Sequence, residues 1–244
     1  MSRLYYDLHL HSCLSPCGDE DMTPCNLVNM AKLNGLDVIA LTDHNSCKNC
    51  AAAMAAGGEA GITVIPGMEL CTSEEIHVVC LFPSLEQAMA FDALVEKRIV
   101  PVENKPDIFG EQFLYDENDH IIGREDNLLI MATTIGVYEV IPLVEACGGF
   151  CYPAHVDKAA NSITACLGDL PEDIGFSAAE LSPRADWKAM KEQYPILSKM
   201  FLLSSSDAHY LEHIAEPRLT LEAEENTPEG ILSSLRKAVR ANNC

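Results

Sequence analysis

The stretch LDVIALTDH, residues 36–44, decides the fold. Its apolar run, which ends at Thr42, is typical of a strand covered on both faces, and it closes on Asp43-His44. Upstream, Thr23-Pro24 reads as a helix N-cap followed by proline at the first helical position, which predicts a helix to about Leu33. The stretch YYDLHLHSC, residues 5–13, reads as a strand before that helix. Together these segments predict a β-α-β unit.

The alternation of strands and helices continues along the chain. Further strands are predicted at 62–70, 75–82, 150–155 and 200–209, with another ending at Glu180, and further helices at 47–56, 84–97, 133–147, 187–193 and 227–239. This order indicates an α/β fold, either a barrel or an open parallel sheet. We expect one domain over residues 1–244, with a hairpin around 116–119 inside an insertion at approximately 100–130 that covers a pocket.

The charge balance is strongly acidic. The chain has 244 residues, with 16 basic and 37 acidic side chains and a formal net charge of −21. Such a surface repels phosphate backbones and anionic membranes, so we expect neither a long nucleic acid nor a membrane as partner. Bound divalent metals would invert this sign inside a pocket, which leaves a small anionic substrate possible.

Eleven cysteines are present, and neither a signal peptide nor a long apolar run accompanies them. We therefore expect a cytoplasmic protein whose thiols stay reduced. Most of these cysteines are interpreted as small buried apolar residues. A structural zinc or iron–sulfur site at Cys13, Cys17, Cys47 and Cys50 stays open as the less favoured alternative.

Eight residues of the types that bind metals lie at or just beyond the carboxyl ends of the predicted strands. Six of the eight histidines in the chain are among them. In parallel α/β proteins these ends meet at one face. Any single member could simply hydrogen-bond a carbonyl, but the set as a whole favours a metal site. The eight residues are His9, His11, His44, Glu69, His77, His155, Asp207 and His209.

The series HLHS, LTDHN, GMEL, EIHVV, PAHVDK and SSDAH resembles the PHP superfamily, the metal-dependent phosphoesterases named for polymerases and histidinol phosphatases. The resemblance implies a distorted, roughly seven-stranded β/α barrel that holds two or three divalent metals, either Zn, Mn or Fe. It also implies three groups of ligands. These are His9, His11, Glu69 and Asp207 for one metal, Glu69, His77 and His155 for a second, and His44 and His209 for a third.

The third metal position departs from the family pattern. Many relatives have Ser-Asp-Gly after the HxHSxxS start, but this chain has Ser15-Pro16-Cys17-Gly18-Asp19. The usual aspartate is therefore a proline. We expect the third position to be complete only if Cys17 or Asp19 reaches it.

The resemblance and the ligand types together indicate hydrolysis of a phosphate ester. Paired metals activate water, so water is the expected nucleophile, and no motif for a protein nucleophile is present. Lys158, three residues past His155, and Arg184, in LSPRADW, are candidate substrate-binding cations, with Arg218 a weaker third choice.

A cytoplasmic phosphatase acting on a small phosphomonoester, such as a nucleotide or sugar phosphate, is the favoured function. Three alternatives stay open. They are phosphodiester cleavage of the exonuclease kind, a non-catalytic metal-binding regulatory module, and an amidohydrolase-like reaction. The sequence leaves the oligomeric state undetermined.

Overall fold

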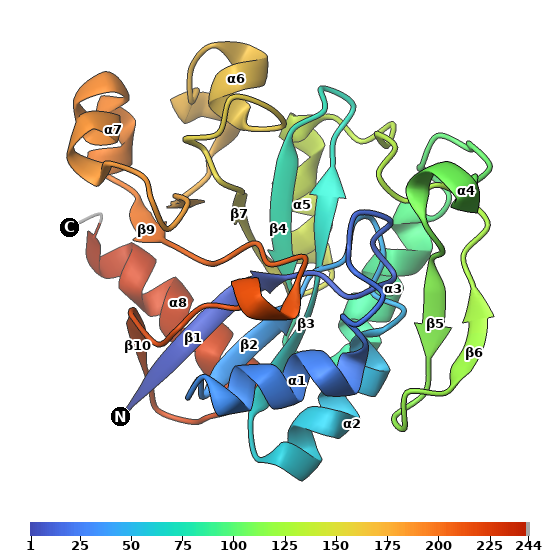
Figure 1. Cartoon of the computed structure of the whole chain (residues 1–244). Helices are drawn as coiled ribbons and strands as arrows, with labels where there is room; N and C mark the ends of the chain where they lie inside the picture. The colour runs from blue at the N-terminus through green and yellow to red at the C-terminus, as the bar shows by residue number, and fades with distance from the viewer. Residues whose placement is uncertain (243–244) are drawn as a thin grey trace.

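The computed structural model describes residues 1–242, and its centre is a curled sheet of six strands in the order β10-β1-β2-β3-β4-β7 (Figure 1). Strands β1, β2 and β3 run parallel, whereas β4 is antiparallel to both β3 and β7, and β10 is antiparallel to β1. The bounds are Ser2–Leu10 (β1), Val38–Leu41 (β2), Thr63–Cys71 (β3), His77–Leu81 (β4), Phe150–Pro153 (β7) and Thr220–Ala223 (β10).

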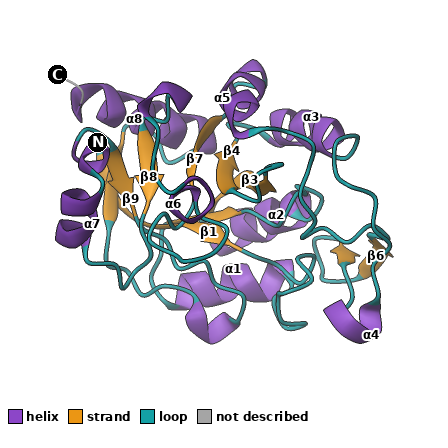
Figure 2. Cartoon of the chain, turned by 90° about the horizontal axis from the view of Figure 1, so that it is seen from above, coloured by secondary structure: helices purple, strands orange, loops and turns teal. Residues whose placement is uncertain are grey.

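Two further strands, β8 (Ala178–Glu180) and β9 (Phe201–Leu203), form a parallel pair beside this sheet. The Val156 amide after β7 donates to the carbonyl of Glu180 at 2.8 Å, and a parallel bridge joins Leu10 to Ala208 after β9. The strands thus curl around one centre, as the view from above shows (Figure 2). The α/β fold is confirmed, whereas a barrel of roughly seven strands and a single domain over 1–244 stay predictions.

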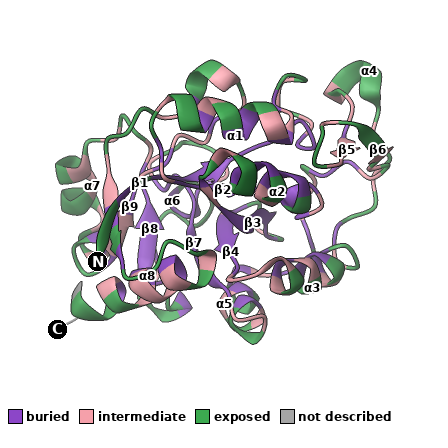
Figure 3. Ribbon diagram, turned by 90° about the horizontal axis from the view of Figure 1, so that it is seen from below, coloured by how far each residue is buried: buried purple, intermediate pink, exposed green. Residues whose placement is uncertain are grey.

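Helices cover the outside of this curled sheet (Figures 2 and 3). Side chains of α1, α2, α3 and α5 share one apolar cluster with the sheet, whereas Ile231 and Leu235 of α8 pack in a second cluster with Leu8 of β1. The bounds are Pro24–Leu33 (α1), Cys50–Ala60 (α2), Leu85–Val95 (α3), Pro106–Phe109 (α4), Val137–Ala146 (α5), Ile163–Leu167 (α6), Trp187–Gln193 (α7) and Pro228–Asn242 (α8).

Several predicted elements are shorter than the sequence indicates, and in two of them polar contacts account for the difference. Strand β9 stops at Leu203 instead of continuing to residue 209, since Ser205 Oγ accepts from the Leu8 amide and Ser206 donates to Asp7. Helix α2 begins at Cys50 instead of residue 47, because the Cys47 amide is tied to the Asp92 carboxylate at 2.7 Å.

The predicted hairpin consists of β5 (Phe113–Tyr115) and β6 (Ile121–Arg124). It lies at the outer edge of the molecule (Figure 1), and its turn is fixed to the start of α1. The Asp119 carboxylate accepts hydrogen bonds from the Thr23 hydroxyl and, at 3.0 Å, from the Cys25 amide. None of its residues lines the cavity between the histidines, so the hairpin does not border that cavity. Its status as an insertion stays a prediction.

Asp119→Ala should destabilise the protein by about 1–3 kcal/mol, because it leaves the Cys25 amide and the Thr23 hydroxyl without their acceptor. Denaturant unfolding would measure this change. Asp126→Ala in the same segment removes an 81% exposed carboxylate and should change stability by less than about 0.5 kcal/mol. Equal effects of the two substitutions would contradict the anchoring role of Asp119.

Candidate metal centre

The eight predicted ligand residues meet at one face of the curled sheet. The donor atoms of seven of them, all except His155, form three overlapping groups, and within each group the atoms lie within 4.8 Å of one another. The overlap places potential ligands for neighbouring cations side by side. The groups are His9, His11, Glu69 and Asp207, then His44, Glu69 and His77, and finally His11, His44 and His209.

Glu69, on β3, is the centre of this arrangement and is only 1% exposed. Five imidazoles point at its two carboxylate oxygens. Their nitrogens lie at 2.9 Å (His77 Nδ1), 3.0 Å (His44 Nδ1), 3.2 Å (His9 Nε2), 3.2 Å (His155 Nε2) and 3.3 Å (His11 Nε2). A carboxylate in this position can bridge two cations.

His77 reaches the site differently from the sequence expectation. It begins β4 and does not end it, so its predicted place at a carboxyl end is wrong. Because β4 runs antiparallel to β3, its first residue lies at the same face as the ends of the parallel strands. The pair Cys71 and His77 faces across this hairpin, which brings the imidazole to Glu69.

Glu180, the last residue of β8, was placed at a strand end by its sequence but was not predicted to belong to the site. Its carboxylate lies 3.0 Å from His9 Nδ1 and accepts from the His155 amide at 3.2 Å. A carboxylate on one ring nitrogen fixes the tautomer and leaves the other nitrogen as the ligand atom. Glu180 therefore directs His9 Nε2 toward Glu69 and Asp207.

Asp43 is a second supporting residue that the sequence analysis did not single out. It is buried directly before His44, and it accepts from the Ser12 amide, the Ser12 hydroxyl and the Ser15 hydroxyl, each at 2.7 Å. Ser15 Oγ in turn lies 3.0 Å from His11 Nδ1 and accepts from the His44 amide at 3.1 Å. One buried carboxylate thus positions the loops that carry His11 and His44.

Asp7, two residues before His9, does not orient a histidine. Its carboxylate accepts from the amide and hydroxyl of Ser206, at 2.9 and 2.6 Å, and from the Ala215 amide at 3.2 Å. These bonds fix the segment that carries Asp207.

Two of the candidate ligands have strained backbones. His155 has φ +30° and Asp207 has φ +54°, in the left-handed region that non-glycine residues rarely adopt. Each lies in the turn just after a strand, and such strain is characteristic of functional sites. The turns aim both side chains inward.

The donor set fits divalent cations. His44 Nδ1, His155 Nδ1 and Asp207 Oδ1 are buried without a well-aligned hydrogen-bond partner in the described chain. His44 Nδ1 and Asp207 Oδ1 nonetheless have polar neighbours at 3.0 Å (Glu69) and 3.2 Å (His11). Buried polar atoms that crowd together without hydrogen bonds indicate a shared ligand between them. Imidazole and carboxylate admit Zn, Mn and Fe equally.

The electrostatics of the cluster are set by the Glu69 carboxylate among the surrounding imidazoles. Burial alone would raise the pKa of Glu69, but the surrounding imidazoles, His77 foremost, hold it well below its usual range. Burial is the main cause that lowers the pKa of His44 to about 4 and that of His209 to about 3. Although burial lowers it, the pKa of His77 is raised to about 10 by the Glu69 carboxylate, so this imidazole is protonated in the chain alone and a bound metal would replace its proton.

Lys158 lies at this site and Arg184 does not. Lys158 lines the cavity between the histidines, and its ammonium group pairs with the Asp207 carboxylate. Arg184 is exposed before α7 and is absent from the cavity lining, so its role in substrate binding stays a prediction.

The two residues considered for the third metal position lie outside the three ligand groups. The side chain of Asp19 accepts from the Asp21 amide at 3.0 Å, which stabilises its own turn, while its backbone amide binds the His209 carbonyl. Cys17 is solvent-exposed, and its thiol belongs to none of these groups.

The chain belongs to the PHP domain family, whose model matches residues 7–233. Proteins of this family are metal-dependent hydrolases of phosphate esters, which makes this chain an enzyme of that class and not a purely regulatory module. Divalent metals are the family's cofactors. The clusters around Glu69 are suited to hold them.

Three comparisons describe its relatives. A 5'-3' exoribonuclease of Haemophilus influenzae is 36% identical over 120 residues, which are 46% of this chain and 43% of that protein. The lesion-specific endonuclease PfuEndoQ of Pyrococcus furiosus shares the fold, with a TM-score of 0.67 and 20% identity over 98% of this chain and 56% of that one. Endonuclease Q in complex with a 27-mer duplex superposes with a TM-score of 0.63 and 19% identity, over 98% and 57%. The chain spans about half the length of these proteins.

The prediction of no long nucleic-acid partner is wrong as an inference from net charge. Endonuclease Q, which shares this fold, was crystallised with a 27-mer DNA duplex that has an abasic lesion at its active site. Net charge is a sum over the whole surface, whereas recognition depends on the local field at the site, where bound cations dominate. Net charge therefore no longer supports a preference for a small phosphorylated substrate.

No helix within residues 1–242 is both long and apolar enough to cross a membrane.

Proposed function

We propose that this chain is a metal-dependent phosphodiesterase that acts on nucleic acid, releasing nucleotides from a strand end. The principal support is the 36% identity, over 120 residues, to a protein named as a 5'-3' exoribonuclease. The Endonuclease Q complex adds that this fold can accommodate a nucleic-acid strand.

The cavities beside the candidate ligands also favour a substrate larger than a single phosphate group. The cavity between the histidines has a volume of about 450 Å³. A second cavity of about 320 Å³ shares Lys158 and Ala159 with it and continues to Gln193 and Tyr194 at the end of α7. Tyr194 offers an aromatic surface on which a base can stack, as in proteins that bind single strands.

We propose that the eight predicted residues around Glu69 hold the metals. When bound, such metals polarise phosphoryl oxygens and activate a water molecule. Glu180 and Ser15 orient the imidazoles of His9 and His11, and Asp43 keeps Ser15 in place. Lys158, which Asp207 holds at the cavity, supplies a cation for the phosphate at the strand end.

A strand end fits the charge distribution better than the middle of a strand. Within residues 1–242, Lys158 is the only lysine or arginine that lines the cavity between the histidines or its neighbour. A protein that tracks a backbone needs a basic groove. Contacts to one terminal phosphate need only a single fixed cation together with the metals.

Purified protein with Mn²⁺ should degrade a 5'-phosphorylated linear oligoribonucleotide, and a chelator should stop this. A circular RNA of the same sequence should resist, because it has no end. Lys158→Ala should lower kcat/KM on the linear substrate by about 10–100-fold, the value of one charge-assisted hydrogen bond. Lys97→Ala, which removes an exposed lysine after α3, is the matched control.

Rapid cleavage of the circle would contradict action at strand ends. Failure to cleave any oligonucleotide under conditions in which the protein holds its metals would contradict the proposal itself.

A further inference from the structure

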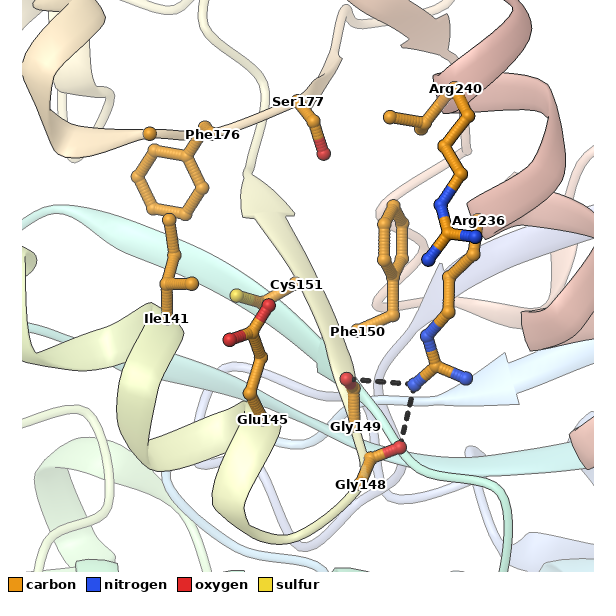
Figure 4. Close-up of a pocket in the computed structure, with 12 residues that line it drawn as sticks. Ile141, Glu145, Gly148, Gly149, Phe150, Cys151, Phe176, Ser177, Arg236 and Arg240 are labelled. Carbon is orange, nitrogen blue, oxygen red and sulfur yellow. Dashed lines mark hydrogen bonds between the residues drawn. The ribbon is translucent and has the colours of Figure 1, made fainter.

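A third cavity lies at the opposite end of β7 from the candidate metal centre. It has a volume of about 360 Å³ and is built from the turn Gly148-Gly149, the start of β7 and the C-terminal part of α8 (Figure 4). Strand β7 runs from Phe150 in this cavity to Pro153, two residues before His155. The four-residue strand, about 13 Å long at 3.3 Å per residue, separates the two sites.

One wall of this cavity is cationic. Arg236 and Arg240 lie four residues apart on α8 and therefore project from one helix face. Arg236 Nη2 donates to the carbonyls of Gly148, at 2.6 Å, and Gly149, at 2.9 Å, which fixes its guanidinium. Arg240 has no hydrogen bond or ion pair within residues 1–242. Two of the 16 basic residues of an acidic chain thus share one hollow.

The opposite wall carries an acceptor. Glu145, on α5, lies across the cavity from the arginines, with Cys151 beside it (Figure 4). The apolar side chains of Ile141, Phe150 and Phe176 line the space between the charged groups. Since neither the Arg240 guanidinium nor the Glu145 carboxylate has a hydrogen-bond partner within the described residues, both charges are available to a ligand.

This arrangement suits a ligand with an anionic end, a flat apolar body and N–H donors at its other end. A nucleoside monophosphate has these features. Guanidinium groups bind phosphate with paired hydrogen bonds, aromatic rings stack on bases, and a carboxylate accepts from the adjacent N–H groups of guanine. The cavity volume lies in the range of about 300–1,000 Å³ that is typical of such ligand sites.

We propose that the cavity formed by Arg236, Arg240, Phe150, Phe176 and Glu145 is a binding site for a nucleoside 5'-monophosphate, separate from the metal centre. The phosphate lies against the two arginines, and the base lies between the phenylalanines with its N–H edge toward Glu145. This inference does not depend on the proposed nuclease activity.

Isothermal titration calorimetry of metal-free protein in chelator, with guanosine 5'-monophosphate as the probe, tests the proposal. We expect one site per chain. Arg240→Ala should weaken binding by about tenfold or more, the value of one charge-assisted hydrogen bond. Lys237→Ala removes the same charge three residues earlier on the same helix, where Lys237 pairs with Glu224 at the surface, and should change Kd less than twofold.

Two further titrations locate the ligand. His11→Ala, which alters the metal centre, should leave the affinity unchanged, and Glu145→Gln should reduce the preference for guanosine over uridine 5'-monophosphate. Because Arg240 is exposed, its truncation should leave the fold intact, and circular dichroism would verify this.

Three results would overturn the proposal. One is the absence of binding at millimolar nucleotide, and another is equal weakening by Arg240→Ala and Lys237→Ala. The third is inorganic phosphate binding as tightly as the nucleotide, which would show a simple anion site without base recognition.

Discussion

Glu69→Gln should lower metal-dependent hydrolysis by about 1,000-fold or more, because it removes the charged bridge of the proposed centre. The amide retains the size of the side chain but has no negative charge to balance the charge of the cations that five imidazoles surround. Metal analysis of the purified variant should show the same loss. Activity and metal content should fall together, since the carboxylate is the residue that the ligand groups of His9 and His77 share.

Glu59→Gln is the matched control, because this glutamate is exposed on α2. It should leave both the hydrolytic activity and the metal content unchanged. A Glu69→Gln protein that retains a full complement of metal and more than a tenth of the activity would show that the centre does not depend on the bridge.

Asp43→Ala should have the largest effect on stability, a loss of about 3 kcal/mol or more in the free energy of unfolding. The substitution leaves the amide and hydroxyl of Ser12 and the hydroxyl of Ser15 buried without their acceptor. Because Ser15 also contacts His11 and the His44 amide, metal affinity should fall as well. Denaturant unfolding and metal titration measure the two effects.

Asp43→Asn should lie between the wild type and Asp43→Ala, because the amide retains one acceptor oxygen. Asp37→Ala, at the partly exposed residue before β2, removes one hydrogen bond from the Tyr5 amide and should cost only about 1 kcal/mol. If Asp43→Ala were no more damaging than Asp37→Ala, the network around Ser15 would not be what holds the two loops.

Local sequence patterns predict the elements of this fold well where hydrophobic and capping signals agree. The run before Asp43 forms a buried strand, and Thr23 caps α1 through the Asn26 amide as expected. The patterns fail where a polar side chain from a distant segment ends an element. Asp92 delays the start of α2, and Asp7 draws the chain out of β9, and neither contact has a local signature.

The gathering of the candidate ligands was predictable, because each is a histidine or an acid that the sequence places near the end of a strand; that they bind metals stays a prediction. The direction of β4 was not predictable, because strand pairing is a property of the whole sheet. His77 therefore lies at the beginning of its strand and not at its end. Glu180 carried the same signal as the ligands and was overlooked. Asp43 required the Ser12 and Ser15 contacts, which only the folded chain brings together.

The left-handed backbones of His155 and Asp207 have a consequence for any effort to make this protein more robust. Each conformation costs about 1–3 kcal/mol for a residue with a side chain, and glycine would adopt it freely. Selection for thermal resistance alone would therefore favour glycine at both positions and discard two of the groups that gather around Glu69. The most stable sequence and the most active sequence of this fold should consequently differ.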